Sequence, residues 1–159
     1  MTVAQGDGQS QVQEDATWRM YLGFAREFFT ALERGLGAEA GVSVADLELL
    51  EPLLAAGEPG LRAKDLAAAA EWQDSRVSHQ LRRMELRGLV TRSRDRQDAR
   101  GTVVGLTDAG AAAARVAQGT RRTLVRDLLI GPLDDDQVRS LEDISARVRA
   151  RVAEAGLAR

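Results

Sequence analysis

Apolar residues recur at steps of three and four along much of the chain, the spacing of one face of an α-helix. The first such segment, about residues 15–37, has the apolar positions Trp18, Tyr21, Leu22, Ala25, Phe28, Phe29, Leu32 and Leu36. The last third, about residues 108–155, keeps the same period, and Gly131 and Pro132 divide it into two helices. The pattern predicts a mainly α-helical protein with long amphipathic helices at both ends.

The middle of the chain, about residues 44–106, has shorter elements. Ser43 and Asp46 have the spacing of a capping box, and the apolar run after them contains Pro52, which we expect to kink or shorten that helix. Two short helices follow, separated by a break at residues 71–73. A pair of short helices joined by a tight break is typical of a helix-turn-helix.

After Gly88 the pattern changes to that of short β-strands, at residues 89–91 and 102–106, with an almost entirely charged segment between them. A hairpin with a charged tip directly after a helix-turn-helix is a wing. We therefore expect a single domain over residues 15–159 that is mainly α, with a small β-hairpin wing: a winged helix-turn-helix core plus a helical region.

The first 14 residues are polar and rich in Gln and Gly, so we expect a disordered N-terminal tail over residues 1–14. They lack the basic and then apolar plan of a signal peptide, and the chain has no run of 18 apolar residues. We expect a cytoplasmic protein with no membrane partner.

The amino-acid composition limits the catalytic and metal-binding groups that the chain can offer. The chain of 159 residues has no Cys, one His (His79) and one Lys (Lys64), which excludes a thiolate nucleophile and a Cys-ligated metal. The remaining enzyme hypothesis is carboxylate chemistry at Asp134, Asp135 and Asp136, but acidic residues at the start of a helix are explained by capping and the helix dipole. We expect neither an enzyme nor a cofactor or metal site.

Positive charge is concentrated in one segment. The formal net charge is −2, yet residues 72–100 contain eight Arg and four carboxylates, a net charge of +4. Charge alone would also fit a solvated face, but these Arg lie on the helix-turn-helix and wing, elements that enter the grooves of DNA. The distribution indicates double-stranded DNA as the partner.

Position along the second short helix separates two kinds of predicted DNA contact. Its first turns are expected to reach base edges in the major groove, through Ser75, Arg76, Ser78, His79 and Gln80. The later basic residues Arg82, Arg83 and Arg87 suit phosphate contacts. On the wing, Arg94, Arg96 and Arg100 are the candidates for DNA contact, because a narrow minor groove attracts arginine.

The stretch from Leu61 to Gly110 resembles the core of the MarR (multiple antibiotic resistance regulator) family of transcriptional regulators. The resemblance rests on Lys64-Asp65-Leu66-Ala67, on Ser75-Arg76-Val77-Ser78-His79-Gln80-Leu81 and on Met84-Glu85-Leu86-Arg87-Gly88-Leu89-Val90. It also rests on a wing motif made of Asp95, Asp98, Arg100, Val104, Leu106, Thr107 and Gly110. With the flanking helices included, the resemblance covers about Asp15 to Ala155.

The resemblance implies a homodimer, built from the first helix and the last two, on a pseudo-palindromic operator. It implies that Arg100 enters the minor groove, that Asp98 helps to hold the wing, and that a small phenolic or anionic ligand releases the DNA. Lys64 stands where the family often has a helix-capping Ser, and without Cys the chain cannot sense oxidants through a thiol.

The apolar residues of the end helices exceed what a winged-helix core can cover, which also favours a homodimer. The aromatic residues Trp18, Tyr21 and Phe24 are candidates for a ligand pocket, with core or interface packing as the alternative. Two hypotheses remain for function: a repressor released by a small ligand, or a DNA-binding regulator without a small-molecule effector.

Overall fold

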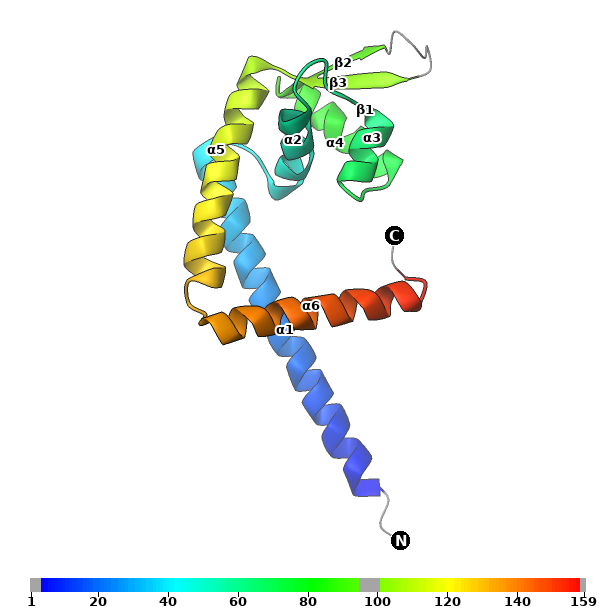
Figure 1. The fold of residues 1–159 in the computed structure, drawn as a ribbon, viewed down its shortest axis with the longest axis vertical. Coiled ribbons are helices and arrows are strands. Elements are labelled where there is room, and N and C mark those ends of the chain that lie inside the picture. Colours follow the sequence, from blue (N-terminus) through cyan, green and yellow to red (C-terminus); the bar gives the residue numbers. More distant parts are fainter. Residues whose placement is uncertain (1–3, 95–100, 158–159) are drawn as a thin grey trace.

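The computed structural model describes residues 4–94 and 101–157 of the chain. It is mainly helical, with one small antiparallel sheet near the middle of the sequence (Figure 1). The elements in chain order are α1 (Ala4–Ala40), α2 (Val44–Ala56), β1 (Leu61–Arg62), α3 (Ala63–Ala69), α4 (Asp74–Leu86), β2 (Val90–Arg94), β3 (Thr102–Leu106), α5 (Asp108–Leu124), a π-helical segment (Val125–Ile130) and α6 (Asp135–Glu154).

A winged helix-turn-helix lobe is formed by α2, α3, α4 and the sheet, at the top of Figure 1. The sheet has the order β1-β3-β2, with Leu61 opposite Val104 and Val90 opposite Leu106. The predicted wing is thus confirmed, and the short β1 adds a third strand to it. The core of the lobe is apolar and includes the fully buried Leu50, Leu53, Leu66, Leu81, Met84 and Val104.

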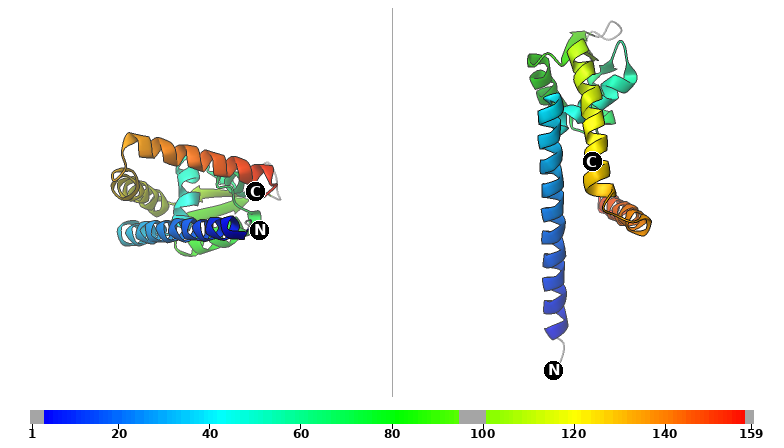
Figure 2. Two further views of the ribbon diagram at one scale, coloured as in Figure 1. Left: turned by 90° about the horizontal axis from the view of Figure 1, so that it is seen from below. Right: turned by 90° about the vertical axis from the view of Figure 1, so that its left-hand side faces the viewer.

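Helices α1 and α5 pack along each other and carry the lobe at one end (Figures 1 and 2). The contact is close at Gly35, where an added Cβ would lie 2.6 Å from a methyl carbon of Leu124. At the other end of α5, a Cβ at Gly110 would lie 1.8 Å from the Leu89 carbonyl oxygen, so only glycine lets α5 start directly against the wing.

Side-chain caps begin three of the helices. Ser43 and Asp46 form the predicted capping box of α2, and Asp134 and Gln137 form that of α6. Thr107 caps α5 by accepting from the Gly110 N–H, while its hydroxyl donates to the Gly88 carbonyl at 2.6 Å. The caps fix where the elements meet, and Thr107 joins the wing to α5.

Two expectations about helix length differ from the structure. Helix α1 already begins at Ala4, within the predicted tail, and Ser10 donates to the Glu14 carboxylate one turn later. Residues 4–14 contain no proline and include several good helix formers, so nothing in them stops the helix. Helix α2 runs on past Pro52 to Ala56 and is not shortened there.

The far half of α1 extends away from the lobe, and α6 runs crosswise below the lobe, separated from it (Figure 1). Helix α6 has no buried residue, although Ile144, Val148 and Val152 form an apolar stripe along it. On α1, Trp18 is 58 % exposed and Tyr21 57 %. A single protomer therefore leaves large apolar surfaces uncovered on both end helices.

Candidate nucleic-acid interface

Helix α4 separates an apolar side from a polar one. Val77, Leu81 and Met84 recur at helical spacing and are buried against the lobe. On the other side, Ser75 is exposed, and so are the residues three, four and seven positions after it: Ser78, His79 and Arg82. This exposed face offers hydroxyl, imidazole and guanidinium groups, the types of group that reach base edges and phosphates.

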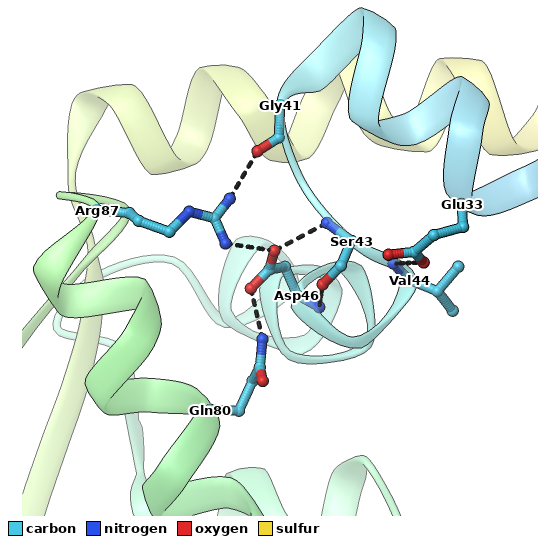
Figure 3. Close-up of polar contacts among 7 residues, drawn as sticks. All are labelled: Glu33, Gly41, Ser43, Val44, Asp46, Gln80 and Arg87. Atoms are coloured by element: carbon cyan, nitrogen blue, oxygen red, sulfur yellow. Dashed lines mark hydrogen bonds and ion pairs between the residues drawn. The ribbon is translucent and has the colours of Figure 1, made fainter.

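Gln80 does not belong to that face, and the prediction that it contacts a base edge is corrected here. Its side chain lies on the buried side of α4, with the residue only 7 % exposed. Its Nε2 donates to Asp46 Oδ1 at 2.6 Å, across to α2 (Figure 3). The amide is therefore engaged inside the protein and does not face solvent.

Arg87, predicted to contact a phosphate, is exposed, but its guanidinium is also bound within the protein. Its Nη1 donates to Asp46 Oδ2 at 2.7 Å and its Nη2 to the Gly41 carbonyl oxygen at 2.6 Å (Figure 3). A planar guanidinium suits this double contact because its N–H groups form a rigid fork. Arg87 thus ties the end of α4 to α2 and to the residue that follows α1.

Asp46 is the centre of this cluster and is fully buried. Burial by itself raises the pKa of a carboxyl group, but hydrogen bonds from the Ser43 backbone and the Arg87 guanidinium outweigh it. The pKa of Asp46 is therefore held below its ordinary value, and the group stays ionised at neutral pH.

A second contact between α2 and the helix-turn-helix is made through Trp72, in the turn between α3 and α4. Its indole Nε1 donates to Glu48 Oε2 at 2.8 Å. The guanidinium of Arg76 lies over the indole ring, 3.5 Å from the ring centroid. This cation–π contact holds Arg76 at the N-terminal end of α4. Arg76 is exposed, as the predicted role requires, but it is stacked on its own protein's tryptophan.

The wing lies beside α4. Arg92 on β2 is 3.9 Å from the Glu85 carboxylate on α4, and Arg94 at the end of β2 is exposed. The other predicted wing residues, Arg96, Asp98 and Arg100, lie outside the described residues. A hollow of about 340 Å³ between α3, α4 and β3 is lined in part by Lys64, Ser78 and Thr102.

The predicted ligand residues Trp18, Tyr21 and Phe24 lie on the exposed part of α1. A depression of about 420 Å³ lies further along the same helix, at the corner with α2. Its lining is Arg26, Phe29, Thr30, Glu33, Arg34 and Val44. The structure thus does not bring the three predicted aromatic residues together with this depression.

The described parts of the chain hold neither a metal site nor a membrane-spanning helix. Among residues 4–94 and 101–157, no group of three or more carboxylate or imidazole side chains is placed to hold a metal ion. Over the same residues, no helix has the length and apolar character needed to span a membrane. Asp134 is used in its capping box, as the sequence predicts.

The contacts of Asp46 and Trp72 were not predicted from the sequence. Their partners are far along the chain: Gln80 and Arg87 lie 34 and 41 residues beyond Asp46, and Trp72 lies 24 residues beyond Glu48. The sequence holds a partial signal of these contacts, because Arg76, Gln80 and Arg87 are spaced by four and seven residues, steps that place side chains on one side of a helix.

Comparisons with known proteins agree with this geometry. The profile of the MarR family matches residues 53–102. The sequence of this chain is 31% identical to that of Sco3205, a MarR family transcriptional regulator from Streptomyces coelicolor whose crystal structure was solved in complex with DNA. That structure has a TM-score of 0.77, and the match covers 89% of this chain and 88% of that one.

AbsC, another MarR family transcriptional regulator from Streptomyces coelicolor, is 29% identical with a TM-score of 0.76, and the match covers 89% of this chain and 95% of that one. The uncharacterized HTH-type transcriptional regulator YdgJ of Bacillus subtilis is 30% identical over 112 residues, which are 70% of this chain and 66% of that protein, slightly less than two thirds of its length.

The fold and the polar face of α4 define a winged helix-turn-helix DNA-binding protein. The chain belongs to the MarR family of transcriptional regulators.

Proposed function

We propose that the protein is a repressor that binds a pseudo-palindromic operator in double-stranded DNA as a homodimer and is released by a small anionic or phenolic ligand. The observation that carries the DNA-binding part is the exposed polar face of α4, with the wing beside it. Such a helix is the element that enters the major groove in helix-turn-helix proteins, while the wing follows the backbone.

Within this proposal, Ser75, Ser78 and His79 contact base edges, and Arg82 and Arg83 contact phosphates. All five side chains are exposed, and all lie on α4. Arg76 contacts DNA from its position on the Trp72 ring, and Arg94 does so from the wing, with Arg96 and Arg100 as further candidates. The proposal omits Gln80 and Arg87 because both are bound to Asp46.

The homodimer is supported by the uncovered apolar surfaces of the end helices. Trp18, Tyr21 and Phe24 on α1, and Ile144 and Val148 on α6, are each 47 % exposed or more. Surfaces of this kind on a folded protomer are typical of an interface. A second copy would cover these surfaces. The dimer would then present two α4 helices to successive major-groove faces of DNA. Its target would be the bacterial chromosome in the cytoplasm.

The ligand part of the proposal is supported by the depression at the corner of α1 and α2. Phe29 and Val44 give it an apolar lining, and Arg26 and Arg34 add two guanidinium groups. The Glu33 carboxylate also lines it but accepts from the Val44 N–H at 2.8 Å. An aromatic carboxylate fits this combination, because arginine binds carboxylates through paired hydrogen bonds.

The experiment is a gel-shift assay with the DNA upstream of the protein's own gene, repeated with benzoate, 4-hydroxybenzoate and the uncharged control benzamide. We expect a shifted band that an acid removes and benzamide does not. Arg34→Gln should keep the shift and lose the response. A shift that no acid changes would favour the alternative of a regulator without a small-molecule effector, and no shift on any duplex would contradict the DNA-binding proposal.

A further inference from the structure

Asp46 lies where three parts of the molecule meet: the end of α1, the start of α2 and the inner side of α4 (Figure 3). Its Oδ2 accepts from the Ser43 N–H at 2.8 Å and from Arg87, and its Oδ1 accepts from Gln80. Both oxygens are therefore used, and the carboxylate is closed off from solvent. The sequence explains only the Ser43 contact, which is part of the capping box.

We propose that Asp46 is a positioning residue for DNA recognition, which fixes the rotation and tilt of α4 through Gln80 and Arg87 so that the exposed face of α4 meets the base edges in one orientation. The proposal rests on the proposed function of α4. It assigns Asp46, Gln80 and Arg87 a role in recognition through the contacts that they make within the protein.

The spacing of the two anchors supports this role. Gln80 lies within α4 and Arg87 is the C-cap residue of that helix, seven residues or about two helical turns further on. One anchor would leave the helix free to rotate and tilt about that point, whereas two anchors on one rigid carboxylate restrict both motions. The exposed Ser75, Ser78 and His79 then have a fixed direction relative to α2.

The apolar contacts of α4 do not provide the same restriction. Val77, Leu81 and Met84 hold the helix to the lobe, but hydrophobic contacts are not directional and tolerate small rotations. Hydrogen bonds to a buried charge require a defined distance and angle. A polar cluster inside an apolar interface is thus a means of selecting one arrangement among several of similar packing.

Arg87 extends the arrangement to α1. Its second nitrogen donates to the carbonyl of Gly41, the residue directly after α1, which has a left-handed backbone with φ of 63°. The same guanidinium therefore touches the start of the lobe and the end of the long helix. The orientation of α4 is set relative to α1 as well as to α2.

The test compares binding to two DNA probes. The first is a duplex enriched from random-sequence DNA by the unaltered protein, and the second is a shuffled duplex of the same base composition. Binding to the shuffled duplex depends mainly on phosphate contacts, so it reports on folded, charged protein, while the ratio of the two affinities reports on base recognition. Circular dichroism at the assay temperature monitors folding.

The variants are Asp46→Asn, which keeps the shape and removes the charge, and Glu51→Gln as a matched control. Glu51 also lies on α2 and is ion-paired, but its partner is Arg121 on α5 and not a residue of α4. We expect Asp46→Asn to lower the affinity ratio about tenfold, the effect of losing one base-pair contact, with binding to the shuffled duplex unchanged. Glu51→Gln should leave the ratio unchanged.

An unchanged ratio in a folded Asp46→Asn protein would overturn the proposal, whether the two affinities stay the same or fall equally. Either result is that of a purely structural role. If Asp46→Asn does not fold, Arg87→Lys replaces it, because lysine keeps the charge but lacks the fork that joins Asp46 to Gly41. The same fall in ratio is then expected, and an unchanged ratio again overturns the proposal. Failure of the unaltered protein to enrich any duplex would instead contradict the proposed function.

Discussion

At the scale of single residues, the lobe depends on polar side chains that connect segments distant in sequence. Asp46 caps its own helix and also binds Gln80 of α4 and Arg87, the residue that caps the end of α4. Trp72 binds Glu48 and supports Arg76. A helical pattern does not reveal such partners, which is why buried Gln80 was predicted to contact a base edge. Arg87 is exposed, and its phosphate contact stays a prediction.

The low pKa of Asp46 predicts a dependence of stability on acid. The unfolded chain takes up the proton near the ordinary pKa of 3.8, and the folded protein takes it up only at lower pH. Asp46 thus adds stability above that pH, and the contribution is lost as pH falls towards the folded pKa. Asp46→Asn should lower the free energy of unfolding at pH 7 by about 2 kcal/mol, because it leaves buried groups without a charged partner.

Denaturant unfolding at a series of pH values from 7 to about 3 checks this prediction. The unaltered protein should lose stability more steeply below about pH 5 than Asp46→Asn does. Glu51→Gln, which alters a more exposed pair on the same helix, should keep the steep loss. Parallel curves for the unaltered protein and Asp46→Asn would show that Asp46 has an ordinary pKa.

Glu71, in the turn of the helix-turn-helix, has a left-handed backbone with φ of 54°. A side chain is disfavoured there, and glycine is not. Glu71→Gly should therefore raise the free energy of unfolding, by about 0.5 kcal/mol after the greater freedom of glycine in the unfolded chain is counted. The control Ala68→Gly, at an exposed position within α3, should lower it by about 1 kcal/mol. Equal losses in both variants would contradict the prediction.

At the scale of elements, the sequence predicted most of the fold, because each helix carries its own periodicity and caps. Ser43 and Asp134 each begin the helix expected of them. The start of α1 was not predicted, since a polar segment without an apolar face gives no periodic signal although it can extend an existing helix. The tip of the wing, with Arg96, Asp98 and Arg100, stays a prediction.

The exposed face of α4 predicts two distinct mutational effects. His79→Ala should weaken binding to the preferred duplex by about 1 kcal/mol and relax the preference at one base pair. Arg82→Ala should weaken binding to all duplexes alike and reduce the slope of log affinity against log salt by about 1. Fluorescence anisotropy over a range of salt concentrations measures both quantities.

The control for these variants is Arg149→Ala, which removes an exposed arginine from α6, away from α4 (Figure 1). It should change neither specificity nor salt slope. If His79→Ala behaves like Arg82→Ala, then His79 contacts the backbone, and the assignment of base edges to this part of α4 fails.

At the scale of the whole molecule, α1 and α5 carry a small lobe whose charge is divided between a basic segment and a more acidic remainder, and α6 follows the end of α5 that is distant from the lobe (Figures 1 and 2). The overall charge of −2 conceals this division, because a net +4 lies in residues 72–100 alone. The sequence indicated that the end helices have more apolar surface than a protomer can bury. It could not indicate the angle between α1 and α5, which depends on packing at positions such as Gly35 and Leu124.

The central claim is that two protomers read one DNA sequence through paired α4 helices. Its most direct test is selection from random-sequence duplexes, followed by measurement of the mass of the complex with the enriched duplex. We predict a pseudo-palindrome with half-sites separated by about one helical turn, or a multiple of it, bound by two protomers. Equal binding to every duplex with no enriched sequence, or one protomer bound to an asymmetric site, would contradict the account.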